Sequence, residues 1–332
     1  MGQAGGSGQL NINGAGLELV TSEGNIGSTS IKYFAVGEGA GSTGSVNVLG
    51  SGKLASGDPI YKNTSGGGTV LPFNFIGKAA GTGVITVQPT TGSYTNQADF
   101  YGGLSVGSTG GNGALNVLAA GKSLITNGMT YASSPGACQV SSPSSYPLAP
   151  APLQISADGA STGLVRATGS SAQLLVSGKT TNNFNPTPAQ LVQEHHIGRI
   201  QIGSGGTLVT ADAATVKVGV SRLLAQAPVG GSMYGYTTNT TVGGMGPINV
   251  TGAGSVVYGS ETATATAPGT IEASQISLAD ATSQLRFNHT SSISFNLPLA
   301  GSGTVVQQAG TTTISPTLAG LPALDPALWQ YD

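Results

Sequence analysis

The stretch Leu115–Leu124, which reads LNVLAAGKSL, decides the fold class of this chain. Leu115 and Val117 are separated by the polar Asn116, which is the alternation of a β-strand with one buried face. Small residues and Gly121 then interrupt the alternation, and glycine readily adopts the positive φ that a sharp corner requires. The stretch therefore predicts a strand, a glycine corner and a second strand.

The same plan recurs along the chain with no helical pattern between the copies. Four further copies are Leu10–Leu19 (LNINGAGLEL), Val46–Leu54 (VNVLGSGKL), Ile200–Val209 (IQIGSGGTLV) and Ile248–Val256 (INVTGAGSV). Such repetition indicates either antiparallel hairpins or the coils of a solenoid. Hairpins favour tight Asn-Gly or Asp-Gly turns between long strands, whereas these strands are short and their corners are rich in glycine. The sequence thus predicts an all-β fold, a single right-handed parallel β-helix (β-solenoid) with extruded loops.

The size of such a solenoid follows from its repeat length. At roughly 20 to 25 residues per coil, the chain is expected to form about 11 to 14 coils. Because neighbouring strands lie about 4.8 Å apart, the rod is expected to be about 50 to 65 Å long.

The composition limits the classes of partner. Asp, Glu, Lys and Arg make up 7% of the 332 residues, and the net charge is −2, whereas a typical soluble domain is about 25% charged. This balance favours neither a nucleic-acid nor an anionic-membrane partner. The 54 glycines suit either a disordered chain or a repetitive β structure. The short bursts of Val, Leu and Ile along the whole chain favour the folded alternative.

Domain organisation is expected to be simple. We predict one β-helical domain over residues 1–315 and a C-terminal tail over residues 316–332. Proline-rich or glycine- and tyrosine-rich segments near 131–152, 180–194 and 227–245 are expected to be loops extruded from the solenoid, because proline is disfavoured in central strands. The single Cys138 cannot form an intramolecular disulfide. The sequence contains no run of 18 apolar residues, so no transmembrane helix is predicted.

Three longer patterns resemble a known family. An apolar-x-Val-Gly run, a turn and alternating apolar residues occur in residues 34–48 and again in residues 104–117. The C-terminal stretches Ala281–Thr290 and Gly301–Ile314 have the same character. Together they resemble the passengers of bacterial autotransporters and their autotransporter-associated β-strand repeats.

The resemblance implies a parallel β-helix at the surface of a Gram-negative cell or outside it. Family passengers reach the outer membrane with a C-terminal β-barrel, which does not follow here. We therefore expect either a passenger separated from its barrel or a stand-alone β-helix of similar repeats. The Gly-Asp-Ser-Gly sequence of protease passengers is absent, as is the Asn-Pro-Asn-Gly sequence of two-partner exoproteins.

The histidines and two glycine motifs are weak candidates for chemistry. His195 and His196 follow Glu194, but adjacent strand residues point to opposite faces, so a solvated loop end is expected. His289 is expected at a structural corner. Gly103–Gly107 matches the nucleophile elbow Gly-x-Ser-x-Gly around Ser105, and Gly39–Gly44 matches a dinucleotide-binding motif. Both motifs need a helix after the turn, and none is predicted.

Scattered carboxylates leave an enzymatic alternative open. A polysaccharide-acting β-helix needs paired acidic residues in a groove, and the candidates that stacking of distant coils could join are Asp58, Asp99 and Asp158. No such pair is evident within one strand, so we expect no enzyme. No calcium-binding Gly-Gly-x-Gly-x-Asp repeat and no cofactor motif occurs, so neither a metal nor a cofactor is expected.

Aromatic pairs are the candidate partner-binding residues. Tyr234 and Tyr236 are predicted to dock a surface glycan or protein, and the alternative is that they close a loop over the solenoid. The pair Phe100–Tyr101 has the same two interpretations. The expected function is that of a non-enzymatic adhesin or surface-display scaffold. The alternatives are a subunit of extracellular filaments and a polysaccharide-acting enzyme.

Overall fold

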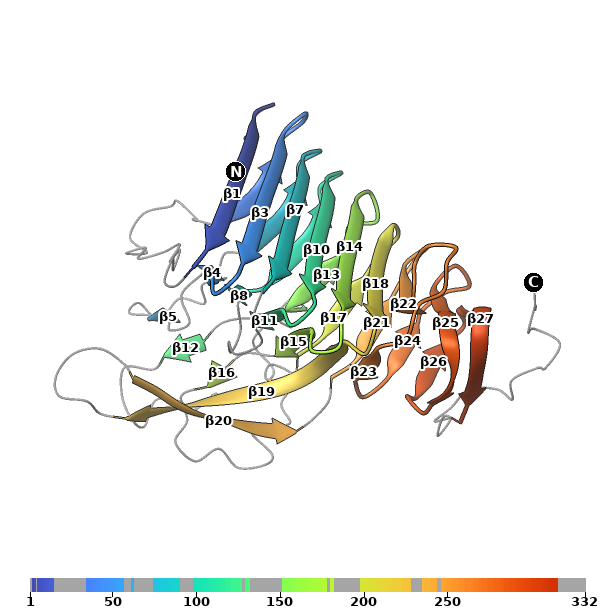
Figure 1. Ribbon diagram of the computed structural model, residues 1–332. Helices are drawn as coiled ribbons and strands as arrows, with labels where there is room; N and C mark the ends of the chain where they lie inside the picture. The colour runs from blue at the N-terminus through green and yellow to red at the C-terminus, as the bar shows by residue number, and fades with distance from the viewer. Residues whose placement is uncertain are drawn as a thin grey trace, which may run out of the picture.

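The computed structural model is an all-β architecture of stacked coils (Figure 1). It describes residues 2–3, 5–14, 34–56, 61–62, 74–89, 98–126, 129–131, 151–177, 180–181, 198–227, 235–243 and 246–315. The strands in this part of the chain form three sheets, called A, B and C, whose pairings are parallel except for the hairpin β19–β20. The predicted parallel β-helix is therefore confirmed. Its right-handed sense, which nearly all parallel crossovers adopt, stays a prediction.

Sheet B is the most regular of the three. In spatial order it contains β1 (Ser7–Asn13), β3 (Thr43–Leu49), β7 (Thr82–Gln88), β10 (Asn112–Leu118), β14 (Thr162–Thr168), β18 (Gly206–Ala211), β22 (Ser255–Gly259), β25 (Gln284–Phe295) and β27 (Thr304–Ile314). Its strands pair in register, so that Gly44, Gly83, Gly113 and Gly163 form one column across the sheet.

Sheets A and C form the other two sides. Sheet A contains β2 (Ala35–Glu38), β6 (Asn74–Lys78), β9 (Leu104–Ser108), β13 (Leu153–Ile155), β17 (Ile200–Ile202), β21 (Ile248–Val250), β24 (Ile276–Leu278) and β26 (Leu299–Gly301). Sheet C contains β4 (Leu54–Ser56), β8 (Ala98–Tyr101), β11 (Lys122–Thr126), β15 (Gln173–Ser177), β19 (Thr215–Ala227), β16 (Thr180–Thr181), β12 (Met129–Tyr131) and β5 (Tyr61–Lys62), with β20 (Gly235–Gly243) and β23 (Thr270–Glu272) also paired to β19.

One coil passes through a strand of sheet A, a corner, a strand of sheet B, a second corner and a strand of sheet C, as in β2, β3 and β4. The length of a coil varies widely. Gln284 pairs with Thr304 only 20 residues later, whereas Asn112 pairs with Thr162, 50 residues later. The predicted uniform coil of 20 to 25 residues is therefore wrong, and so is the count of 11 to 14 coils. Nine strands in sheet B give a rod of about 40 Å.

The core lies inside the three sheets. Alternate residues of each sheet B strand point inward, and this gives β3, β7 and β10 the same pattern of buried and partly exposed residues. The inward column of sheet B is Val46, Ile85, Leu115, Val165, Leu208, Val256 and Leu285, all fully buried. Stacked aliphatic columns of this kind join each coil to its neighbours, so stability is shared along the rod.

Glycines fix the corner between sheets A and B. A Cβ atom on Gly113 would overlap the carbonyl oxygen of Ile76 in the preceding coil. Gly77 has a φ of 69°, and a Cβ atom there would overlap the carbonyl oxygen of Asn112 in the following coil. Gly37 and Gly107, which end the two apolar-x-Val-Gly runs, face the carbonyl oxygens of Thr82 and Thr162 in the following coils in the same way, so this pattern marks places where two coils approach through their backbones.

Sheet C extends beyond the coils on one side. The first part of β19 pairs with β15, and its second part pairs with β16 and with the antiparallel strand β20 (Figure 1). The short strands β12 and β5 continue this extension. The segments predicted as extruded loops therefore include two strands of sheet C, β16 and β20, which pair with β12 and β19.

The remainder of the predicted loops, residues 132–150, 182–194, 228–234 and 244–245, lies outside the described residues, as do Cys138 and the predicted tail 316–332. In the part of the chain that the structure describes, no helix is long and apolar enough to cross a membrane.

Candidate functional site

The outer face of sheet B presents side chains in rows that run from strand to strand. The first row, here called the hydroxyl row, consists of Thr43, Thr82, Asn112 and Thr162, all of them exposed. The second, here called the apolar row, lies two residues further along each strand and consists of Val84, Ala114 and Leu164, all of them partly exposed. Because the strands are in register, equivalent side chains repeat about every 4.8 Å.

Hydrogen bonds between coils fix several of these side chains. The bonds run from Thr43 Oγ1 to Ser7 Oγ at 2.8 Å, from Asn47 Nδ2 to Asn11 Oδ1 at 2.8 Å, and from Thr162 Oγ1 to Asn112 Oδ1. A side chain that is bonded to its neighbour loses little further freedom when a ligand binds. The outer face of sheet B is therefore a preorganised surface.

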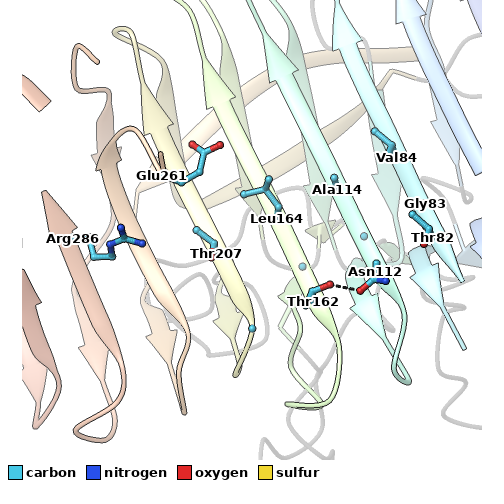
Figure 2. Close-up of a pocket in the computed structure, with 13 residues that line it drawn as sticks. Thr82, Gly83, Val84, Asn112, Ala114, Thr162, Leu164, Thr207, Glu261 and Arg286 are labelled. Carbon is cyan, nitrogen blue, oxygen red and sulfur yellow. Dashed lines mark hydrogen bonds between the residues drawn. The ribbon is translucent and has the colours of Figure 1, made fainter. Parts of the chain in front are cut away.

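A groove of about 410 Å³ crosses this face (Figure 2). It is lined by the hydroxyl and apolar rows of β7, β10 and β14 and, beyond them, by Thr207, Glu261 and Arg286. Figure 2 shows Leu164 near the middle of the groove, with Glu261 and Arg286 toward one end and Thr82 and Val84 toward the other. The groove is therefore polar and neutral at one end and charged at the other.

An ion pair and a cation occupy the charged end. Arg166 on β14 donates to Glu261 Oε1 and, at 2.9 Å, to Asn116 Oδ1. Burial lowers the pKa of the Arg166 guanidinium from its usual value, which still leaves an arginine charged. Arg286 on β25 donates through Nη2 to Gln308 Oε1 at 2.8 Å.

The segment that carries Glu261, residues 260–268, lies against the outside of sheet B. Asp212 N donates to the carbonyl oxygen of Ala267 at 2.7 Å. Val209 and Val257 follow the inward residues Leu208 and Val256, so their side chains point to the outer face of sheet B. Both are nevertheless fully buried. The segment thus covers the sheet beside the groove and forms one of its ends.

Asp158, one of the three predicted carboxylates, organises a corner. It lies between β13 and β14, and its carboxylate accepts hydrogen bonds from Ser161 Oγ at 2.8 Å and from the backbone N–H groups of Ala160, Ser161 and Thr109. Partial burial raises the pKa of this carboxyl, but the bonds from Ser161, Ala160 and Thr109 outweigh burial and leave the pKa below its usual value. Thr109 belongs to the preceding coil, so Asp158 ties two coils together.

Asp280 does the same at the corner between β24 and β25. It accepts hydrogen bonds from Thr282 Oγ1 at 2.6 Å and from the N–H of Gly252, in the preceding coil, at 2.6 Å. These bonds lower its pKa from the usual value. Both aspartates are thus structural residues of the A–B corner.

The other predicted carboxylates do not join Asp158. Asp99 is on β8, between the inward residues Ala98 and Phe100, so it points to the outer side of sheet C, where it is 3% exposed. Asp99 is thus on sheet C, whereas Asp158 is at the corner between sheets A and B, and the hypothesis of a stacked pair is wrong for these two. Asp58 lies outside the described residues. Among the residues described, no three His, Cys, Asp or Glu side chains are grouped as metal ligands.

Of the three histidines, His289 alone is among the described residues. His195, His196 and Glu194 lie outside the described residues. His289 is fully buried on β25, and its Nε2 is 2.9 Å from Thr312 Oγ1 on β27. Burial lowers its pKa. Its ring also packs edge-on against Phe287 at a centroid distance of 6.2 Å, so His289 is a structural residue that packs between β25 and β27. It lies within strand β25, so the predicted position at a corner is wrong.

Both glycine motifs are corners of the solenoid. Ser105 is 3% exposed inside β9, which is followed by a turn and by β10. Gly107 has a φ of 73°, and a Cβ atom there would overlap the carbonyl oxygen of Thr162. The Gly39–Gly44 segment connects β2 with β3. A strand follows each motif, so neither has the geometry of its enzymatic counterpart.

None of the predicted aromatic residues is among the described residues that line the groove. Tyr234 lies outside the described residues, and Tyr236 lies on β20, opposite Gln226 of β19. The Tyr234 and Tyr236 binding prediction therefore stays a prediction. Of the Phe100–Tyr101 pair, Phe100 is fully buried and packs in the hydrophobic core, so it is not a surface binding residue.

Sequence reasoning missed the groove. Arg166 and Glu261 are 95 residues apart, and Arg286 belongs to a later coil, so no local motif joins them. The one local signal was Arg166 itself, a charged residue in the outward alternation of a chain with few charges. Comparisons of the chain with protein-family models, with curated proteins and with solved structures give no match.

Proposed function

We propose that this protein is a non-enzymatic, extracellular β-helical protein that acts as an adhesin or a surface-display scaffold. The observation that carries the proposal is the outer face of sheet B. Its rows of hydroxyl, amide and apolar side chains are in register and tied by hydrogen bonds between coils. Such a face offers many similar, preorganised contacts to a partner.

The carboxylates support a binding role. Asp158 and Asp280 are engaged at corners, and Glu261 is paired with Arg166. General acid–base hydrolysis of a glycan uses two carboxyl groups on opposite sides of one bond. The engaged positions of these three groups favour binding over hydrolysis.

Binding and hydrolysis can be measured on the same partner panel. Labelled protein is incubated with bacterial and epithelial cells and with immobilised surface glycans and matrix proteins, and the supernatant is assayed for released sugar. We expect saturable binding without product, and heat-unfolded protein serves as the control. Product release, or no retention on any partner, would contradict the proposal.

The edges of sheet B favour a second candidate, a filament subunit. The edge strands of the described sheet, β1 (SGQLNIN) and β27 (TVVQQAGTTTI), contain no charged residue, and edge strands without charges pair readily with other chains. Sedimentation velocity over a hundredfold range of concentration, with negative-stain electron microscopy, separates the candidates. Growing assemblies support the filament, and a constant monomer supports the adhesin.

A further inference from the structure

The groove on sheet B runs across the strands. Its lining passes from β7 through β10, β14 and β18 to Arg286 on β25, which are five steps in the strand order of the sheet. At about 4.8 Å per step, the groove accommodates a chain about 24 Å long. An open groove of this length suits an extended polymer segment better than a compact small molecule.

The two rows of the groove match the two sides of a sugar chain. The apolar row of Val84, Ala114 and Leu164 offers a narrow apolar floor, and Thr82 and Asn112 of the hydroxyl row stand beside it. A pyranose ring presents C–H groups on its faces and hydroxyl groups around its edge. A chain of such rings advances by a length similar to the strand spacing at each residue, so successive rings meet equivalent side chains.

A peptide fits the same surface less well. An extended peptide gains most of its affinity by adding backbone hydrogen bonds to a sheet edge. In the groove, the backbone groups of β7, β10 and β14 already bond to one another in the parallel ladder. A peptide here would leave its own backbone without these partners.

The charged end adds selectivity for an acid. Arg166 and Glu261 neutralise each other, and Arg286 leaves one positive charge at this end of the groove. A guanidinium has five N–H donors in a fork that suits a carboxylate, and Arg286 gives one of them to Gln308.

We propose that this groove binds an extended acidic oligosaccharide, with sugar rings on the apolar row and a carboxylate at Arg286. This inference rests on the proposed binding function and names its site and its ligand class. The role of Arg286 is to contact the ligand, and the role of Ala114 is to keep the floor of the groove open.

The test uses the full chain, a hexamer of galacturonic acid and the neutral cellohexaose, with titration calorimetry. Arg286→Gln should weaken binding of the acidic hexamer about tenfold, which is the value of one charge-assisted hydrogen bond, and abolish the preference over the neutral one. Ala114→Trp should fill the groove and weaken both probes at least tenfold.

Two matched variants serve as controls and should bind like the unmodified chain. Lys53→Gln removes an exposed cation from the turn after β3. Gln9→Trp adds the same bulk at an exposed position in the register of the apolar row, but on β1, beyond the groove. Circular dichroism verifies that every variant is folded.

Three results overturn the inference: equal affinity for the two hexamers, unchanged affinity after Ala114→Trp, or displacement of the labelled protein from cells by an extended peptide but not by the acidic hexamer. If labelled protein still binds cells in any of these cases, the proposed function stands and only the groove assignment fails. If it binds neither cells nor glycans, both fail.

Discussion

The early coils and the last coils of the solenoid solve the same packing problem differently. In β3, β7 and β10 the inward residues are aliphatic, such as Val46 and Leu115. In the last coils they include Tyr258, Phe287 and Phe295, whose ring centroids lie 5.3 to 5.5 Å apart. The early strands of sheet B are thus held by aliphatic columns, whereas its last strands are held by a few large rings, each of which carries more of the local stability.

The A–B corner differs in the same way. In the early coils Gly113 faces the carbonyl oxygen of Ile76, and there is no room for a side chain. At the corresponding place before β25, the hydroxyl of Ser283 donates to the carbonyl oxygen of Val250 at 3.1 Å. The same position of the corner therefore accepts either a glycine in close contact with the backbone of the preceding coil or a side chain that donates a hydrogen bond to it.

Loss of a ring should have the largest effect. Phe287→Ala is expected to reduce the free energy of unfolding by about 4 kcal/mol, because it leaves a cavity among fully buried neighbours. Val117→Ala, in an aliphatic column of the early coils, should cost about 2 kcal/mol. Urea unfolding measures both. Equal losses would contradict the proposed difference between the two regions.

The corner position gives a prediction of intermediate size. Gly113→Ala should cost about 3 kcal/mol, because its Cβ atom meets backbone that cannot move without shifting a coil. Ser283→Ala, at the corresponding corner, should cost about 1 kcal/mol for one buried hydrogen bond. Gly110→Ala is the control: Gly110 has a φ of 75° and open space around it, so only backbone strain of about 1 kcal/mol applies. Similar losses at Gly113 and Gly110 would show that the close approach is unimportant.

The last coils should also be sensitive to pH. Burial lowers the pKa of His289 in the folded state, so folding favours the neutral ring. The stability that this provides is complete above the unfolded pKa of about 6.5 and is lost as pH falls through the folded pKa. We expect amide exchange in β25 and β27 to accelerate several-fold relative to β10 between pH 7.5 and 5.5, after correction for intrinsic exchange.

His289→Gln tests the origin of that sensitivity. The variant keeps a polar side chain near Thr312 but does not titrate in this range. It should remove most of the difference between the two regions. A pH response that persists in the variant would assign the sensitivity to another group.

The corner aspartates should give the smallest effects. Asp158→Ala removes bonds to two coils but acts at a mostly exposed site, so we expect a loss below about 1 kcal/mol at pH 7. Asp280→Ala should have a similarly small effect, because Asp280 also accepts its hydrogen bonds at the surface of a corner. Since both pKa values are lowered, each contribution is present above the ordinary aspartate pKa and is lost as pH falls through the folded pKa. Thermal unfolding at pH 7 and pH 3 measures this, and a larger effect at pH 3 would contradict it.

The sequence was sufficient for the local elements and insufficient for their stacking. The alternation in Leu115–Leu124 and its glycine corner predicted β10, a turn and β11, and the structure contains all three. Alternation and glycine conformation act over a few residues, so they can be read directly. Coil length was predicted wrongly because it depends on the segments between sheets C and A, which obey no repeat. Since the groove brings together residues from six coils, no local pattern in the sequence could predict it.

The central claim is that the strands of sheet B stay in register although the coils differ in length, because this register aligns the side chains of both rows and of the groove. The most direct test is disulfide formation between Thr86→Cys and Asn116→Cys, in a chain that also carries Cys138→Ser. Thr86 and Asn116 are register partners on β7 and β10, and parallel neighbours lie within the range of Cα distances that a disulfide spans. We predict rapid, complete cross-linking in the variant that combines Thr86→Cys with Asn116→Cys. We predict little cross-linking in the variant that combines Thr86→Cys with Leu118→Cys. Preferential cross-linking to position 118 would mean a slipped register and would contradict the account.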